Sequence, residues 1–511
     1  MKNLDIAYEI LNYDSYNKRL ENLLKGNKKY PVKKHVPIGQ SSCGFPIEHY
    51  SIGNGPMHIV YMGGAHGNEI IGVDYVTQLM KNLSEGNGVF KDFDPNKFTV
   101  DFIPCQNPEG FYTTTYALSS VLKGKTTDEI ESFSKKYWRA YREDDSNVVA
   151  INSILKDFHE HFNLPGDPNN LIKGFWIYFV KKDITPEAVI RLLTMLFKFS
   201  DKSIKNFIEK KWDEKFKSKP FIPQDKYHHE MFSSVTIDCI PEIDEPHKML
   251  KEKLYEMYKN RNFPIGTLAN FFPNADGVNL NDNNEPYFEE VKEELRRTGV
   301  LYANARDNNL SKKIPGPVGM PSYDYKSEFK YAPENLALFE FLRRQESSDQ
   351  NFAFINCHGT GGMIFTYPVF EDDTKKAHED GVTRDFAFYI NNRIATEYTK
   401  ETGRVYEKET GKNEPYKVVG YPNRVTGVGD LLRKQYLASF ILELSKMGGN
   451  PIAPYGDKNG NYKLTMESNM SAMMKMLETI LKLEHLYNAT YHMEYNDKGQ
   501  VTYQEGVRKK R

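Results

Sequence analysis

Short apolar runs alternate along the chain with segments whose apolar residues recur at helical spacing. Four runs predict buried strands because they are rich in β-branched and aromatic residues, and they lie at 57–62, 98–104, 352–357 and 436–444. Residues 69–83 repeat apolar positions at helical spacing and predict a helix directly after the first strand. Strands that are apolar throughout suit the interior of a parallel sheet covered by helices. The pattern therefore predicts an α/β fold with a mixed, mostly parallel central sheet flanked by helices.

The pattern of apolar and polar residues changes between residues 147 and 264. This part is lysine-rich and carries amphipathic helical patterns but none of the apolar strand runs. We interpret it as a helical insertion in the α/β domain. The expected segments are a first part of the main domain, the insertion and a second part of the main domain, at residues 1–146, 147–264 and 265–511.

Composition and charge argue against a nucleic-acid-binding, membrane-bound or secreted protein. Lys plus Arg (68) nearly cancels Asp plus Glu (69), so no overall field would attract nucleic acid or an anionic membrane. The amino-terminal residues are polar and acidic where a signal peptide needs an apolar run, and nowhere do about 18 apolar residues follow one another. The 4 cysteines are scattered and form no C-x-x-C pair, which fits a reducing compartment. We expect a cytoplasmic protein without nucleic-acid or membrane partners, and its oligomeric state stays open.

A histidine and a glutamate stand close together in the stretch MGGAHGNEIIG, at the predicted turn between the first strand and its helix. His66 and Glu69 are three residues apart and can present an imidazole and a carboxylate to one point. Catalytic zinc takes three protein ligands, and two histidines with one glutamate are a known set. His358 follows the apolar run 352–357, at the carboxyl end of a strand, where open α/β sheets place their ligands. These residues predict a site for one zinc ion per chain, although a helix-capping His66 and a structural, buried His358 remain alternatives.

Six motifs in a fixed order give the sequence a family resemblance. They are HGNE (66–69), NPEG (107–110), YWRAYR (137–142), GVNLNDN (277–283), CHGTGGMIFTYP (357–368) and SFILEL (439–444). Together they resemble the zinc carboxypeptidases of the carboxypeptidase A and B type. The resemblance covers most of the chain outside the insertion. It implies a carboxypeptidase-like α/β fold, bound zinc, and hydrolysis of a peptide or amide bond.

The resemblance also implies roles for single residues. His66, Glu69 and His358 would hold the zinc ion. Glu443 matches the general base of the family, and Arg139 matches the arginine that polarises the scissile carbonyl and stabilises its oxyanion. Hydrolysis by metal-activated water requires a proton acceptor and a fixed cation of this kind. Glu443 stands in an apolar run, where an unpaired carboxylate would cost several kcal/mol, so a function is favoured. Arg139 stands in a charged helical stretch and could instead be an ordinary surface arginine.

The expected substrate-binding residues include one departure from the family. Asn281 matches the asparagine that binds the terminal carboxylate of a substrate, and Tyr421 matches the mobile substrate-binding tyrosine. The family keeps an arginine directly after this asparagine, but the present chain has Asp282 there. An aspartate cannot donate a hydrogen bond to a carboxylate and would repel it. Arg306 or Arg424 could supply the missing cation, or the site could accept a substrate with a cationic or amidated end.

The sequence thus predicts a zinc-dependent peptidase with a peptide or amide substrate. Relatives that cut γ-D-glutamyl-diamino acid bonds in cell-wall peptides suggest one unusual substrate class, by fold-level analogy. One alternative is a small-molecule amidohydrolase or deacylase of the aspartoacylase type. Another is a non-catalytic peptide-binding module, but such a module would not need the general base Glu443.

Overall fold

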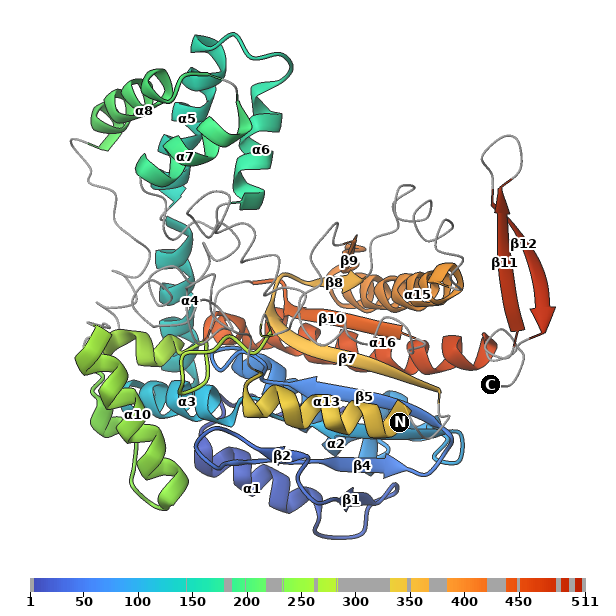
Figure 1. Cartoon of the computed structure of the whole chain (residues 1–511). Coiled ribbons are helices and arrows are strands. Elements are labelled where there is room, and N and C mark those ends of the chain that lie inside the picture. Colours follow the sequence, from blue (N-terminus) through green and yellow to red (C-terminus); the bar gives the residue numbers. More distant parts are fainter. Residues whose placement is uncertain are drawn as a thin grey trace.

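Eight strands form a mixed sheet at the centre of the described part of the chain (Figure 1). The structure is a computed structural model, and it describes residues 4–143, 145–178, 186–197, 199–216, 232, 234–261, 265–281, 283, 331–346, 351–366, 384–420, 438–447, 451–483, 489–495 and 501–507. The strands of the sheet are β1 (Val32–Lys34), β4 (Tyr50–Gly53), β5 (Met57–Gly63), β6 (Phe98–Ile103), β7 (Asn351–Thr360), β8 (Met363–Thr366), β9 (Lys417–Gly420) and β10 (Ala438–Ser445). They are hydrogen-bonded in the order β1-β4-β6-β5-β7-β10-β8-β9.

The centre of the sheet is parallel and its edges are mixed. Strands β6, β5, β7 and β10 run parallel to one another. The pairs β1/β4, β4/β6 and β10/β8 are antiparallel, and β9 runs parallel to β8. The strands predicted at 57–62, 98–104 and 352–357 are confirmed as β5, β6 and β7. The run at 436–444 is strand β10 from residue 438 onward, and its first two residues lie outside the described ranges. The predicted fold class is confirmed.

Helices surround the sheet and extend beyond it (Figure 1). The described α-helices are α1 (Tyr13–Leu23), α2 (Ile70–Glu85), α3 (Pro108–Leu122), α4 (Thr127–Glu143), α5 (Asp145–His161), α6 (Pro168–Tyr178), α7 (Pro186–Leu196), α8 (Asp201–Phe216), α10 (Glu245–Arg261), α13 (Pro333–Glu346), α15 (Arg384–Thr410) and α16 (Lys463–Lys482). The smaller elements include the 3-10 helices η3 (Ile265–Asn270) and η5 (Ala453–Gly456), the ribbon β2 (Gly39–Gln40) with β3 (Pro46–Ile47), and the hairpin β11 (Ala489–Tyr495) with β12 (Val501–Val507).

Both faces of the sheet are covered, which explains why its strands are apolar throughout. Successive side chains of a strand point to opposite faces. Ile59 and Tyr61 of β5 are buried in the larger hydrophobic cluster, together with residues of α2, α15 and α16. Val60 and Met62 are buried in a second cluster, to which α13 contributes. A strand buried on both faces has no polar side to alternate with.

The helices between residues 145 and 216 pack by themselves. Helices α5, α6, α7 and α8 share a hydrophobic cluster that includes Phe158, Leu192 and Ile208. Figure 1 shows this group standing away from the sheet, beyond α4. Helix α10 differs, because Leu250 and Leu254 are buried in the larger cluster beside the sheet. The division of the chain at residues 147 and 264 stays a prediction.

None of the helices within the described ranges is both long enough and apolar enough to cross a membrane.

Candidate metal centre

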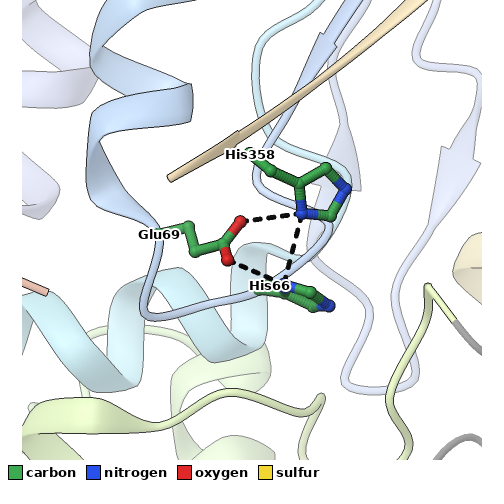
Figure 2. Close-up of side chains that lie close together, drawn as sticks. All are labelled: His66, Glu69 and His358. Atoms are coloured by element: carbon green, nitrogen blue, oxygen red, sulfur yellow. Dashed lines mark hydrogen bonds and ion pairs between the residues drawn. The ribbon is translucent and has the colours of Figure 1, made fainter. Parts of the chain in front are cut away.

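Two neighbouring parallel strands bring the predicted metal ligands to one edge of the sheet. Strand β5 pairs with β7 in a register that ends with Gly63 opposite Cys357. His66 and Glu69 lie in the turn after β5, and His358 directly follows Cys357 on β7. The carboxyl ends of parallel strands meet at the same edge, so side chains from residues 292 positions apart come together (Figure 2).

The three side chains converge on a small buried volume. His66 Nδ1 lies 3.0 Å from Glu69 Oε1, and His358 Nδ1 lies 2.8 Å from Glu69 Oε2. The two Nδ1 atoms are 3.3 Å apart, and one potential ligand atom from each residue lies within 4.8 Å of the others. Figure 2 shows both imidazoles turned toward the carboxylate. All three residues are buried.

One of these distances fits the geometry of a zinc site, whereas the 3.0 and 2.8 Å contacts with the Glu69 carboxylate are hydrogen-bond distances. Two ligands of a tetrahedral zinc ion with bonds of about 2.0–2.1 Å lie about 3.3–3.4 Å apart. The separation of the two Nδ1 atoms, 3.3 Å, falls in this range. His66 Nε2 is buried and has no hydrogen-bond partner among the described residues, so the polar contacts of this ring lie on its Nδ1 side. Two imidazole nitrogens and one carboxylate also form a donor set that zinc accepts.

Local hydrogen bonds fix the turn that carries His66 and Glu69. The backbone N–H of Glu69 donates to His66 O at 3.2 Å, and α2 begins with the next residue, Ile70. The backbone N–H of Gly359 donates to Glu69 Oε2 at 3.0 Å, which orients the carboxylate from the β7 side. The helix predicted at 69–83 is therefore α2, and Glu69 is the residue that precedes it.

Glycines allow the segments around the turn to approach closely. A Cβ atom on Gly67 would lie 2.2 Å from the carbonyl carbon of Gly110, so the HGNE and NPEG motifs are in backbone contact. A Cβ atom on Gly72, in the first turn of α2, would lie 2.6 Å from Cys357 O. Since no side chain fits at either position, these glycines let the HGNE turn meet the NPEG segment and let the first turn of α2 meet β7.

The electrostatics of the cluster favour a charged carboxylate. Burial alone would raise the pKa of Glu69, but the two adjacent imidazoles outweigh it and hold this pKa below its ordinary value. A negative carboxylate beside two imidazole nitrogens is one of the donor sets that bind catalytic zinc.

The predicted general base lies beside the cluster on the next strand. Strands β7 and β10 are parallel, and Glu443 is the register partner of His358. Register partners on neighbouring strands point to the same face of a sheet, so Glu443 and His358 share a face. Glu443 is only partly buried, whereas the His358 side chain is 1% exposed. A partly exposed carboxylate at this edge can be reached by water and substrate.

Comparisons with known proteins point to one family. Residues 21–171, which contain the HGNE and NPEG motifs, match the family model of the zinc carboxypeptidases. The predicted resemblance to that family is confirmed over these residues. A search of curated proteins finds no match.

Solved structures match this chain only at low sequence identity and with TM-scores below 0.5. Bovine thrombin-activatable fibrinolysis inhibitor, in complex with tick carboxypeptidase inhibitor, is 11% identical over 93% of this chain and 98% of its own, with a TM-score of 0.39. Carboxypeptidase A from Helicoverpa armigera is 11% identical over 92% of this chain and 73% of its own, with a TM-score of 0.41. A metallo-carboxypeptidase from Burkholderia cenocepacia is 9% identical over 93% of this chain and 71% of its own, with a TM-score of 0.36.

The other predicted site residues are described only in part. Asn281 is buried, and its Oδ1 has no hydrogen-bond partner among the described residues. Arg139 belongs to α4, but the surroundings of its side chain lie outside the described part of the structure. Asp282, Tyr421 and the two alternative cations, Arg306 and Arg424, also lie outside it. Their roles stay predictions.

Sequence reasoning missed a segment that contacts the metal-binding turn. The Phe272 ring lies against the His66 ring, with centroids 4.2 Å apart, and Phe272 O accepts a hydrogen bond from Gly67 N at 3.0 Å. Asn68 Nδ2 donates to Asn270 Oδ1 at 2.7 Å. No periodicity or motif marks residues 270–272 as partners of a turn 200 positions away.

Proposed function

We propose that the protein is a zinc-dependent peptidase that hydrolyses a peptide or amide bond. The convergence of His66, Glu69 and His358 is the observation that carries this proposal. Two imidazole nitrogens 3.3 Å apart share one buried carboxylate, and they come from strand ends far apart in the sequence. Buried polar groups of this kind are expensive unless paired or bound to a metal. The family match over residues 21–171 supports the same chemistry.

Different residues of the chain would bind the zinc ion, orient one of its ligands and accept a proton from water. Bound zinc would supply Lewis acidity and lower the pKa of its water ligand. His66, Glu69 and His358 would hold the ion, and the Gly359 N–H would keep the Glu69 carboxylate oriented. Glu443 would accept the proton of the attacking water, because it shares a face with His358 and is partly exposed.

Further residues complete the proposed machinery, and their roles come from the family resemblance. Arg139, carried by α4, would stabilise the negative charge that develops on the carbonyl oxygen. Asn281 would bind the end of the substrate through its amide, whose buried Oδ1 has no hydrogen-bond partner among the described residues. With Asp282 next to it, we propose a substrate whose end is cationic or amidated, such as an unusual or cell-wall peptide. Tyr421 would contribute to substrate binding.

The experiment that tests the function identifies products directly. Zinc-loaded protein is incubated with a mixed library of peptides, muropeptides and acylated amino acids, and the products are identified by mass. Cleavage of peptide bonds that depends on zinc supports a peptidase. Cleavage of acylated amino acids alone would support a deacylase of the aspartoacylase type instead. Binding of peptides without turnover in the presence of zinc would support a non-catalytic module.

A further inference from the structure

Two carboxylates are buried next to the metal-binding turn but are not part of the proposed site. Glu109 lies in the first turn of α3, within the NPEG motif, and Glu334 lies in the first turn of α13. Both side chains belong to residues that are 0% exposed. Buried carboxylates are rare unless they are fully hydrogen-bonded, so each needs an explanation.

Glu109 joins two loops that are distant in the sequence. Its carboxylate accepts hydrogen bonds from the backbone N–H of Cys43 and from Ser42 Oγ, which lies 3.0 Å from each oxygen. On the other side, Ala275 N donates to Glu109 Oε2 at 2.7 Å. All these partners are donors, so both carboxylate oxygens act as acceptors in these hydrogen bonds. Removing the acceptor would leave buried N–H groups unsatisfied.

The loop held by Glu109 is the same segment that contacts the metal-binding turn. Ala275 lies three residues after Phe272, whose ring packs on His66 and whose carbonyl accepts from Gly67 N. Asn270, at the start of the segment, accepts from Asn68 Nδ2. Segment 270–275 therefore lies between the Glu109 carboxylate and the HGNE turn and contacts both.

We propose that Glu109 is a positioning residue for the metal centre. Its carboxylate anchors segment 270–275, and the segment in turn holds the Phe272 ring and the Asn68 amide that fix the His66 turn. This inference rests on the proposed function, because it concerns the affinity of the same zinc site. Partners that orient a metal ligand without touching the metal typically change metal affinity about 10–100-fold when they are mutated.

Glu334 provides an internal comparison in the same network. Ser42 N donates to Glu334 Oε1 at 3.2 Å, and Asn274 Nδ2 lies 3.3 and 3.2 Å from its two oxygens. Burial, followed by the negative charge of Glu109, raises the pKa of Glu334 to about 8, so this carboxyl is neutral at pH 7. A glutamine resembles a neutral carboxylic acid in size and can still accept these bonds. The Glu334→Gln change should therefore be tolerated where Glu109→Gln is not.

The test measures zinc dissociation constants by competition with a chelator, together with thermal unfolding of the metal-free proteins. Glu109→Gln should weaken zinc binding by about 10–100-fold, while Glu334→Gln at pH 7 should leave it unchanged. Asp101→Asn is the matched structural control. Asp101 is a buried carboxylate of β6 that lies 2.9 Å from His49 Nε2 and 2.8 Å from His58 Nδ1, in a cluster apart from the turn. The Asp101→Asn variant should have a lower unfolding temperature than the wild type but the same zinc affinity.

The outcomes separate this inference from the proposed function. If the wild type binds zinc and Glu109→Gln binds it equally tightly, the inference is wrong and the proposed function stands. Equal losses of zinc affinity in Glu109→Gln and Asp101→Asn would mean a general effect of stability, and would also overturn it. If the wild type and His358→Ala take up the same zinc, the proposed site itself is wrong.

A second variant covers the case in which Glu109→Gln does not fold. Glu109→Asp keeps the charge in the first turn of α3 but shortens the side chain by one methylene, so it cannot span both Cys43 N and Ala275 N. It should fold and still bind zinc more weakly than the wild type. Zinc affinity equal to that of the wild type would contradict the positioning role.

Discussion

Glu69 contacts both histidines of the candidate centre, and each histidine faces a different oxygen of its carboxylate. His66 and Glu69 could be predicted from sequence because their spacing places them in one turn. His358 could be predicted only as the residue at a strand end, together with the order of the family motifs. The distance between the two Nδ1 atoms depends on the strand order of the sheet, which no local pattern contains.

At the scale of the residue, His358→Ala should abolish stoichiometric zinc binding. Two remaining ligands rarely hold zinc against water. His247→Ala is a matched control, because His247 is also a fully buried histidine but contacts Tyr116 and Asp244 instead of the cluster. Metal analysis of the purified proteins should find about one zinc in the control and little in His358→Ala. Full occupancy in His358→Ala would show that this residue is not a ligand.

The Glu443→Gln variant should distinguish the role of a general base from the role of a metal ligand, because only turnover should change. Glutamine keeps the size of the side chain but cannot accept a proton, so turnover should fall by roughly two to four orders of magnitude, the usual share of general-base catalysis. Zinc content should stay at the wild-type level, because Glu443 lies on β10 and is not a member of the three-residue cluster. Steady-state rates and metal content are measured on the same samples. Turnover equal to that of the wild type would rule out the base.

At the scale of the element, local sequence patterns predict the central strands, which are buried on both faces, but not the outer strands of the sheet. Strands β4 and β8 were not predicted, because each is only four residues long and gains its stability from pairing with β6 and β10. Helix α10 lies within the predicted insertion, and its Leu250 and Leu254 pack in the larger core. Amphipathic periodicity predicts a buried side for a helix but does not identify the partner.

Close approach of α2 and β7 gives a prediction at this scale. Gly72→Ala would place a Cβ atom 2.6 Å from Cys357 O, so the end of β7 must move away from the first turn of α2. Overpacking of this kind typically costs about 1–3 kcal/mol. We expect reduced stability of the metal-free protein and weaker zinc binding, because His358 directly follows Cys357. Denaturant unfolding and chelator competition measure the two effects, and no change in either would contradict the packing argument.

At the scale of the whole molecule, the cytoplasmic location and the substrate class stay predictions. The helices α5, α6, α7 and α8 have a core of their own beside the α/β domain. The sequence alone indicates a change in the pattern of apolar and polar residues between 147 and 264. It could not show that α10 packs against the main core, since that depends on which surfaces meet in three dimensions.

Global stability should depend on pH through Glu334. The pKa of this buried carboxyl is raised from its ordinary value to about 8, so the folded state keeps a proton that the unfolded chain releases. Its contribution to stability is therefore full at low pH and is lost as the pH rises toward and through 8. The negative charge of Glu109 of α3 acts on it directly. Lys253 of α10, which binds Asp276 at 2.8 Å, is linked to it only through Ser42, whose Oγ accepts from Lys253 and whose N–H donates to Glu334.

Glu334→Gln removes this titration and tests it. Relative to the wild type, the variant should become more stable as the pH rises from about 5 to about 9, because only the wild type holds a proton in its folded state that its unfolded chain releases. Urea unfolding of both metal-free proteins across this range gives the difference in the free energy of unfolding. A difference that does not change with pH would mean that Glu334 does not titrate in this interval.

The most direct measurement of the central claim is anomalous X-ray scattering at the zinc absorption edge from crystals of the zinc-loaded protein. We predict one strong peak per chain, bound by Nδ1 of His66, Nδ1 of His358 and the carboxylate of Glu69. A peak at any other position with none between these three residues, or no peak at all under saturating zinc, would contradict the account.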